Sequence, residues 1–214
     1  PDMVIDFQNN IWVTAAFSGT VDFDPGPGVF NLSGSFDIVI IKLDVAGSFI
    51  TAMSLGSSDF DDVTSTHIDN ENNFYLSGLV NGTVDFDPGL SIHNVTCQGS
   101  FILKLSNTGV FQWVKTFPNA SISDLVSDDN AFIYSTGNYY DTVDFDPGPG
   151  SHILSPSFFE DAFILKLSSQ GNFIWVRNYN SPFEGFNESI AINSLGHIIT
   201  VGQKLGPVDF DPGV

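Results

Sequence analysis

One acidic turn occurs four times along this chain. It reads VDFDPGPG at residues 21–28 and 143–150, and VDFDPG at residues 84–89 and 208–213. The copies begin at residues 21, 84, 143 and 208, so they are 63, 59 and 65 residues apart. A period held this closely predicts one structural unit repeated along the chain. Because a catalytic site is normally built once per domain, a motif present four times favours an architectural role, or an ion site that supports the architecture.

The charge balance excludes several classes of partner. The 214 residues include 6 Lys and Arg against 25 Asp and Glu, which gives a formal net charge of −19. This charge repels nucleic acids and anionic membrane surfaces and attracts cations. Only 14% of the residues are charged, which favours an extracellular β protein over a cytosolic enzyme. No apolar run reaches the ~18 residues that a transmembrane helix needs, so we expect no membrane insertion.

The segments between the acidic turns align into four short stretches per unit. The first covers residues 36–44, 100–106 and 161–168, and the second covers 48–56, 110–117 and 172–179. The third covers 62–69, 122–129 and 187–194, and the fourth covers 11–17, 74–80, 132–138 and 197–203. They are rich in β-branched and aromatic residues, turn residues separate them, and no helical period occurs. The sequence therefore predicts an all-β fold, a β-propeller-like repeat of four-stranded antiparallel blades.

The count of these stretches predicts about three and a half blades. The division is a half blade at residues 1–34 and blades at residues 35–98, 99–158 and 159–214, together one repeat domain. The missing half leaves three alternatives: further blades of the same protein, a second chain that completes a ring of about seven blades, or an open array. An open array exposes unpaired strand edges, so we favour further blades. Because the chain begins at Pro1 inside a repeat, we expect a fragment whose targeting signal lies elsewhere.

Two stretches carry a resemblance to a known family. They are DAFILKLSSQGNFIWVRNY at residues 161–179 and IDNENNFYLSGLVNGTVDFDPG at residues 68–89. Their pattern resembles the SBBP-type β-propeller repeat of bacterial secreted and surface proteins, and the DFDPG extension is similar to a version in large surface proteins of Bacteroidota exported by the type IX system. The resemblance covers essentially the whole chain. It implies an extracellular or cell-surface location and a role in adhesion or surface assembly, and it does not identify a ligand.

The aspartates of the acidic turns form pairs two positions apart. In an extended segment both carboxylates of a pair share one face, while the valine and phenylalanine face the blade. Two neighbouring carboxylates and a tight Gly-rich turn suit Ca²⁺, with backbone carbonyls and water completing its shell. The alternative is an Asx-type turn in which the carboxylates accept backbone N–H bonds and no ion is bound. The candidate metal ligands are Asp22, Asp24, Asp85, Asp87, Asp144, Asp146, Asp209 and Asp211.

The histidines do not predict a transition-metal site. His93 and His152 each stand six residues after the second aspartate of their turns, but Phe30 holds the equivalent place after Asp24. A position that is not kept between repeats favours a surface or strand role. No nucleophile, phosphate-loop or zinc-protease signature occurs, and four equivalent turns cannot supply the two differently tuned acids of a glycosidase. We therefore expect no enzymatic activity.

The aromatic residues leave two functions open. Trp12, Trp113, Trp175 and the 21 phenylalanines recur at strand positions, which favours core packing; exposed examples would form a carbohydrate-stacking platform. Cys97 stands alone, so no intrachain disulfide is possible, and we expect it to be buried. The sequence thus favours a structural and interaction repeat module whose partners are further blades or a second chain, a surface protein or a glycan. The alternative is a glycan-binding propeller.

Overall fold

The computed structural model of the chain describes residues 1–157, 159–179 and 185–204, and these residues form β-strands and turns only. Three sheets have four strands each, every neighbouring pair is antiparallel, and the strand order follows the chain. The expected all-β fold of four-stranded antiparallel sheets is therefore confirmed. Within the described residues, no helix has the length and apolar character that crossing a membrane requires.

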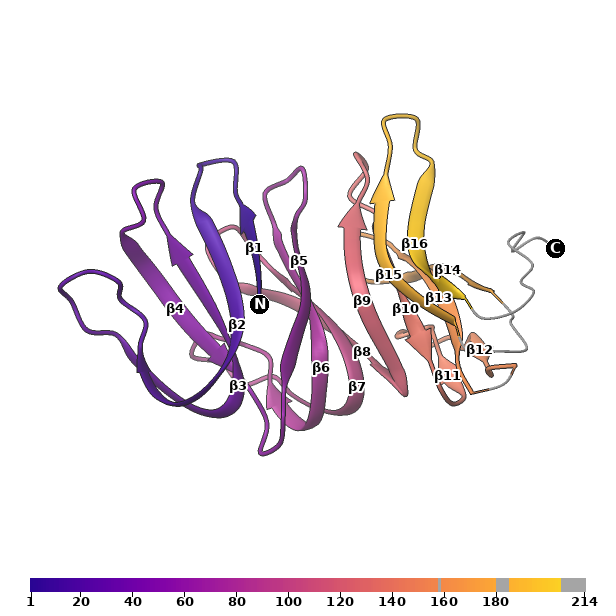
Figure 1. Cartoon of the computed structure of the whole chain (residues 1–214), viewed down its shortest axis with the longest axis horizontal. Coiled ribbons are helices and arrows are strands. Elements are labelled where there is room, and N and C mark those ends of the chain that lie inside the picture. Colours follow the sequence, from indigo (N-terminus) through magenta and orange to yellow (C-terminus); the bar gives the residue numbers. More distant parts are fainter. Residues whose placement is uncertain (158, 180–184, 205–214) are drawn as a thin grey trace.

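The sheets follow one another along the chain (Figure 1). The first sheet contains β1 (Asp2–Ile5), β2 (Ile11–Asp22), β3 (Asn31–Leu43) and β4 (Phe49–Leu55). The second contains β5 (Asp62–Ile68), β6 (Phe74–Asp85), β7 (Asn94–Leu105) and β8 (Phe111–Pro118). The third contains β9 (Ala120–Ser127), β10 (Ile133–Tyr139), β13 (Asp161–Leu167) and β14 (Phe173–Tyr179), with β11 (Val143–Asp144) and β12 (Ile153–Leu154) as a separate short ladder. In the fourth, β15 (Gly185–Ile192) pairs with β16 (Ile198–Lys204).

The sheets begin two strands earlier than the division drawn from the sequence. The acidic turn does not end a unit, because in each of the three four-stranded sheets it lies between the second strand and the third. The predicted boundary after residue 34 falls inside β3, which is hydrogen-bonded to β2 of the predicted half blade at residues 1–34. The β2–β3 ladder runs from the pair Ile11–Leu43 to the pair Asp22–Asn31. A repeated sequence has no intrinsic starting point, so only hydrogen bonding could fix the phase. The described half unit is β15 and β16, at the other end of the chain.

One kind of five-residue hairpin turn joins most neighbouring strands. In the turn at residues 44–48, the Asp44 side chain accepts N–H bonds from Ala46 and Ser48, and Gly47 at its fourth position has φ of 79°. An acceptor side chain at the first position and a left-handed fourth residue are the chemistry that a tight turn requires. The same turn begins at Asp6, Asp69, Ser106, Asp128, Ser168 and Asn193.

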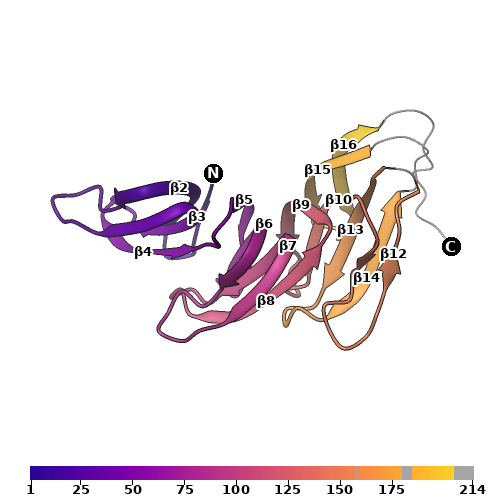
Figure 2. The ribbon, with the colours of Figure 1, turned by 90° about the horizontal axis from the view of Figure 1, so that it is seen from below.

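Successive sheets pack face to face through their first strands. Strand β5 lies against β1, β2 and β3; β9 lies against β5, β6 and β7; and β15 lies against β9, β10 and β13. Figure 2 shows the sheets side by side as a fan. Three apolar clusters fill the spaces between them, and in the first of these Trp12 stacks on Phe74 with ring centroids 4.7 Å apart. Trp12 and Cys97 are buried as expected, whereas Trp113 and Trp175 are half-buried.

Candidate functional site

The acidic turn of the first sheet is held together by its own carboxylates. Asp22 Oδ1 accepts N–H bonds from Asp24 at 3.1 Å and from Phe30 at 2.8 Å. Asp24 Oδ1 accepts the N–H of Gly26 at 2.7 Å. The first carboxylate therefore closes the loop, and the second fixes the bend after Pro25. This geometry is that of the Asx-type turn.

The described copies of the turn repeat this pattern. Asp85 Oδ1 accepts from Asp87 at 3.1 Å and from His93 at 2.8 Å, and Asp87 Oδ1 accepts from Gly89 at 2.8 Å. Asp144 Oδ1 accepts from Asp146 at 3.0 Å and from His152 at 2.7 Å, and Asp146 Oδ1 accepts from Gly148 at 2.8 Å. The backbone N–H of His152 is the main cause that lowers the pKa of Asp144, against a smaller effect of burial. The fourth copy, with Asp209 and Asp211, lies outside the described residues.

The phenylalanine between the aspartates anchors each turn. Phe86 and Phe145 are fully buried, and their rings lie 5.0 Å from Phe101 and 4.8 Å from Phe163. Phe23 is half-buried and meets Phe17 edge-on at 5.1 Å. The expected division, with apolar side chains inward and carboxylates outward, is confirmed in the second and third sheets and is weaker in the first.

The acidic turns belong to hairpin arms that fold back along the outer strand of their sheets. We call residues 18–35, 81–98 and 140–157 the arms. At the arm tip Phe30 lies 4.9 Å from Phe49 at the start of β4, although these residues flank opposite ends of β3. The bend falls where Phe36 takes a left-handed φ of 62° and the β2–β3 register shifts. The arm therefore partly covers the outer edge of the sheet.

The same contact explains the two histidines. His93 stacks near Phe111 at 4.6 Å, and His152 near Phe173 at 5.0 Å, in the places that Phe30 and Phe49 hold in the first sheet. In each of the three sheets this position therefore places a flat ring against the aromatic ring at the start of the outer strand. A cross-strand hydroxyl pair also recurs in each arm: Thr20 with Ser33, Thr83 with Thr96, and Thr142 with Ser155, at 2.7–2.9 Å.

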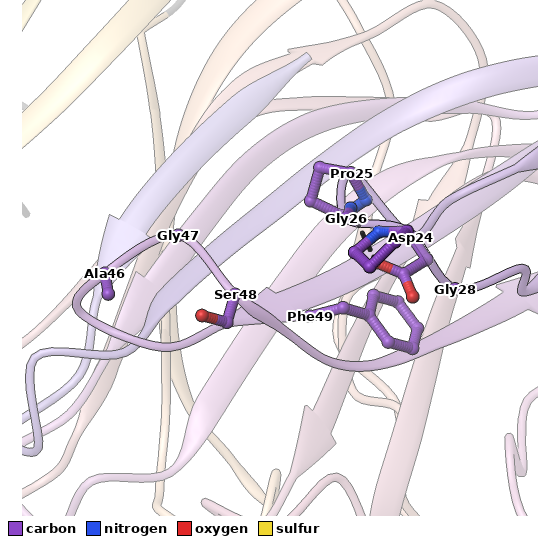
Figure 3. A pocket seen from close by; sticks show the side chains of 9 residues that line it. Asp24, Pro25, Gly26, Gly28, Ala46, Gly47, Ser48 and Phe49 are labelled. Atoms are coloured by element: carbon purple, nitrogen blue, oxygen red, sulfur yellow. Dashed lines mark hydrogen bonds between the residues drawn. The ribbon is translucent and has the colours of Figure 1, made fainter.

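A cavity of about 450 Å³ lies between the first arm and the neighbouring hairpin turn. It is lined by residues 24–28 and 46–49, and Figure 3 shows the Phe49 ring beside the Asp24 carboxylate. Each turn hydrogen bond engages Oδ1 of its carboxylate, so Oδ2 is the atom that could face a cation. Among the described residues, no three His, Cys, Asp or Glu side chains gather as a metal-binding group. An ion in the turns would therefore depend on an Asp pair, backbone carbonyls and water.

A second repeated constellation was not singled out from the sequence. Asp6 Oδ2 accepts the indole N–H of Trp12 at 3.1 Å and pairs with Lys42 Nζ at 3.0 Å, while the same ammonium lies 4.4 Å above the Trp12 ring. Lys42 also donates to the carbonyl of Asn107 in the second sheet at 2.8 Å. Burial opposes ionisation of Asp6, but hydrogen bonds from Asn10, Lys42 and Trp12 outweigh it and lower its pKa to about 2.

The following sheets contain related clusters. Lys104 lies 3.8 Å from Asp69 and donates to the carbonyl of Ser169 in the third sheet, and Tyr75 donates to Asp69. Tyr134 likewise donates to Asp128, and Lys166 lies over its ring at 4.7 Å. The sequence contained a signal, because these three lysines are half of its six Lys and Arg and recur in the stretches IKL, LKL and LKL.

The inner strands carry a third set of contacts between sheets. Asp2 Oδ2 accepts from the N–H and hydroxyl of Thr66. Asp124 accepts the hydroxyl of Ser65 on Oδ1, and the hydroxyl of Ser189 on Oδ2. Each of these bonds joins one sheet to the next, so this set of repeated polar residues couples neighbouring sheets.

The comparisons with known proteins include a distant relative. No protein-family model matches the chain. The chain is similar to an uncharacterized WD repeat-containing protein of Acanthamoeba polyphaga mimivirus, at 27% identity over 231 residues that cover 87% of this chain. The chain spans 16% of that relative's length. That relative is named for its WD repeats, and the four-stranded antiparallel sheets of this chain agree with a propeller-like repeat fold.

Proposed function

We propose that this chain is a segment of a β-propeller-type repeat protein that acts as a structural and interaction module, without catalytic activity, in a larger secreted or cell-surface protein. The observation that carries this proposal is the use of repeated polar groups as joints between sheets. Lys42 and Lys104, equivalent residues of successive sheets, each donate to a turn carbonyl of the following sheet. A stack coupled in this way presents its turns on a rigid support, which suits adhesion or surface assembly.

The location is tested on cells of the source organism. Antibodies against the chain are applied to intact and to lysed cells, with a cytosolic protein as the control. We expect intact cells to be labelled as strongly as lysed cells, and we expect protease added outside the cells to remove this labelling. Labelling confined to lysed cells would rule out a secreted or surface role and would leave the repeat architecture unaffected.

Calcium in the acidic turns is the second part of this proposal. The support is chemical: each turn sets two carboxylates outward and commits one oxygen of each, and the net charge of −19 favours cations. The matched variant is Asp85→Asn with Asp87→Asn, because an amide oxygen still accepts the turn N–H bonds but carries no charge. Titration calorimetry of EDTA-treated protein is expected to show Ca²⁺ binding that falls by one site in this variant. Absence of heat in the parent protein would leave the Asx turn as the whole role of the motif.

A groove favours glycan binding as an alternative function. A cavity of about 340 Å³ is bordered by the exposed rings of Phe60 and Tyr140, and the amide side chains of Asn81 and Gln98 line it. Aromatic faces with neighbouring amides match the apolar and polar sides of a sugar ring. A glycan array probed with the parent chain and with Tyr140→Ala tests this role, with Phe7→Ala as an exposed aromatic control. Consistent sugar binding lost only in Tyr140→Ala supports it, and no binding by the parent chain contradicts it.

A further inference from the structure

The repeats are of two kinds that alternate along the chain. The residue four positions before the first hairpin turn of each sheet is Asp2, Ser65, Asp124 and Ser189 in succession. The acidic turns alternate in the same order, since the longer VDFDPGPG belongs to the first and third units and VDFDPG to the second and fourth. We call these Asp-type and Ser-type sheets.

The two kinds meet through one carboxylate. Asp124 of the third sheet accepts the Ser65 hydroxyl from the preceding sheet at 2.7 Å. It accepts the Ser189 hydroxyl at 2.8 Å and the N–H of Ile190 at 2.9 Å from the following sheet. An Asp-type sheet is thus bonded on both sides by Ser-type sheets. Among the described residues, the equivalent Asp2 of the first sheet is bonded only to the sheet that follows it, where Thr66 donates to its carboxylate.

The first sheet exposes the face that other sheets bury against a predecessor. Met3 on β1 is 60% exposed, whereas its equivalents Leu125 and Ile190 are 3% and 5% exposed. These equivalents lie in strands that pack on the sheet before them, β9 on the second sheet and β15 on the third. The face of β1 that carries Met3 therefore has the apolar surface of a joint, and none of the described sheets packs on it.

The fourth sheet exposes the opposite half of such a joint. Ile199 and Val201 on β16 are 51% and 62% exposed. Tyr75 and Ser77 hold the same places on β6 and are fully buried beneath the following sheet. The same two places are also buried in the first and third sheets. The apolar residues on β16 thus form the face on which a following sheet would pack.

We propose that these two faces bind each other, so that a second copy of this chain docks its β15–β16 sheet on β1 in a head-to-tail joint. The inference rests on the proposed repeat architecture and specifies which sheet covers β1. A Ser-type sheet packs on the strand that carries Asp2, as the second sheet packs on the strand that carries Asp124. Ser189 of the second copy stands at the Ser65 place, opposite Asp2 Oδ1. Because the two faces differ, the contact is heterologous, and it closes into a ring or extends into a chain.

Sedimentation velocity over a range of protein concentrations tests the joint, in 0.3 M NaCl to screen the net charge. Met3→Asp blocks the β1 face, Val201→Asp blocks the β16 face, and Leu90→Asp, at an exposed turn residue away from both, is the control. The parent chain and the control are expected to associate as concentration rises, while each face variant alone stays monomeric. An equimolar mixture of the two face variants is expected to form a heterodimer and nothing larger, because one intact face remains on each.

Three results would overturn the joint: a parent chain that is monomeric throughout, a face variant that associates alone, or a mixture that stays monomeric. Circular dichroism of each variant establishes that it is folded, so that loss of association is not loss of structure. A folded, monomeric parent chain would remove the head-to-tail joint and leave the surface-module function standing, since that function is tested by cell labelling.

Discussion

At the scale of single residues, the buried Asp6 is expected to contribute strongly to stability. Its side chain is 3% exposed and holds the ammonium of Lys42, which is 9% exposed, together with the indole of Trp12. Removing one partner of a buried pair leaves an uncompensated charge, which typically costs several kcal/mol. We expect Asp6→Ala to lower the free energy of unfolding by about 2–4 kcal/mol. Urea denaturation at pH 7 measures this loss, and Asp59→Ala, at an exposed aspartate, is expected to change it by less than about 0.5 kcal/mol.

The same residue predicts an acid-dependent loss of stability. The pKa of Asp6 is lowered to about 2 from 3.8, so the folded state favours the ionised form. Its contribution is present above pH 3.8 and is lost as the pH falls through about 2. A shift of this size corresponds to about 2–3 kcal/mol. Asp6→Asn is expected to flatten the stability profile between pH 4 and 2 by about that amount. An unchanged profile would show that other carboxylates dominate acid unfolding.

Residue patterns made the acidic turns predictable but not the lysine clusters. Alternation in VDFDPG was enough to place Phe86 and Phe145 inside, because the side-chain period of a strand is fixed. It could not choose between calcium and an Asx turn, since both use the same carboxylates and the same bend. The role of Lys42 is not predictable from the sequence, because its partners, Asp6 and the Asn107 carbonyl, are 36 and 65 positions away in the chain. Only the packing of one sheet on the next brings them together.

At the scale of strands, a glycine in the second strand permits a bulge in the first. The first strand shifts register opposite Gly78, Gly137 and Gly202 in the second, third and fourth sheets. A Cβ at any of them would collide with a backbone carbonyl, which for Gly137 is that of Ser121. Ala15 holds this place in the first sheet, where the β1–β2 ladder ends before it. The glycines are therefore fixed by close backbone approach rather than by φ.

Gly137→Ala is expected to destabilise the chain by about 2 kcal/mol or more, because the backbone atoms it meets cannot move without breaking the ladder. The reciprocal variant Ala15→Gly introduces no clash and is expected to lower the free energy of unfolding by less than about 1 kcal/mol. Chemical denaturation followed by tryptophan fluorescence compares the two. Equal losses of unfolding free energy in the two variants would mean that the bulge opposite Gly137 can rearrange to accommodate a methyl group.

Strand existence was more predictable than strand grouping. The hairpin turns are recognisable in the sequence by an acceptor side chain followed by a glycine or asparagine, as at Asp44 and Gly47. The fold-back of the first arm was not predictable, because it depends on the bend at Phe36, a residue whose type does not favour a left-handed φ. The units predicted from the sequence begin two strands late because the prediction places their boundaries at the acidic turn. This turn is the clearest repeat in the sequence, but in the four-stranded sheets it lies between the second and third strands.

At the scale of the whole molecule, the charge of −19 acts on every sheet at once. The described ion pairs are Lys42 with Asp6 and Lys104 with Asp69, and the 25 Asp and Glu of the chain outnumber its 6 Lys and Arg. The mutual repulsion of the acidic side chains disfavours a compact stack and weakens as salt shortens the Debye length from ~30 Å at 0.01 M to ~10 Å at 0.1 M. Sodium chloride should therefore stabilise the chain without binding at any site.

We expect the melting temperature to rise by roughly 3–6 °C between 0.01 and 0.3 M NaCl, which corresponds to about 1–2 kcal/mol in a chain of this length. Thermal unfolding followed by circular dichroism measures the rise. Neutralising two exposed acids with Asp59→Asn and Asp129→Asn should reduce it, because less repulsion remains to be screened. Calcium at millimolar concentration adds little ionic strength, so a rise with CaCl₂ beyond that of NaCl at matched ionic strength requires specific sites. Equal effects of the two salts would assign the stabilisation to screening alone.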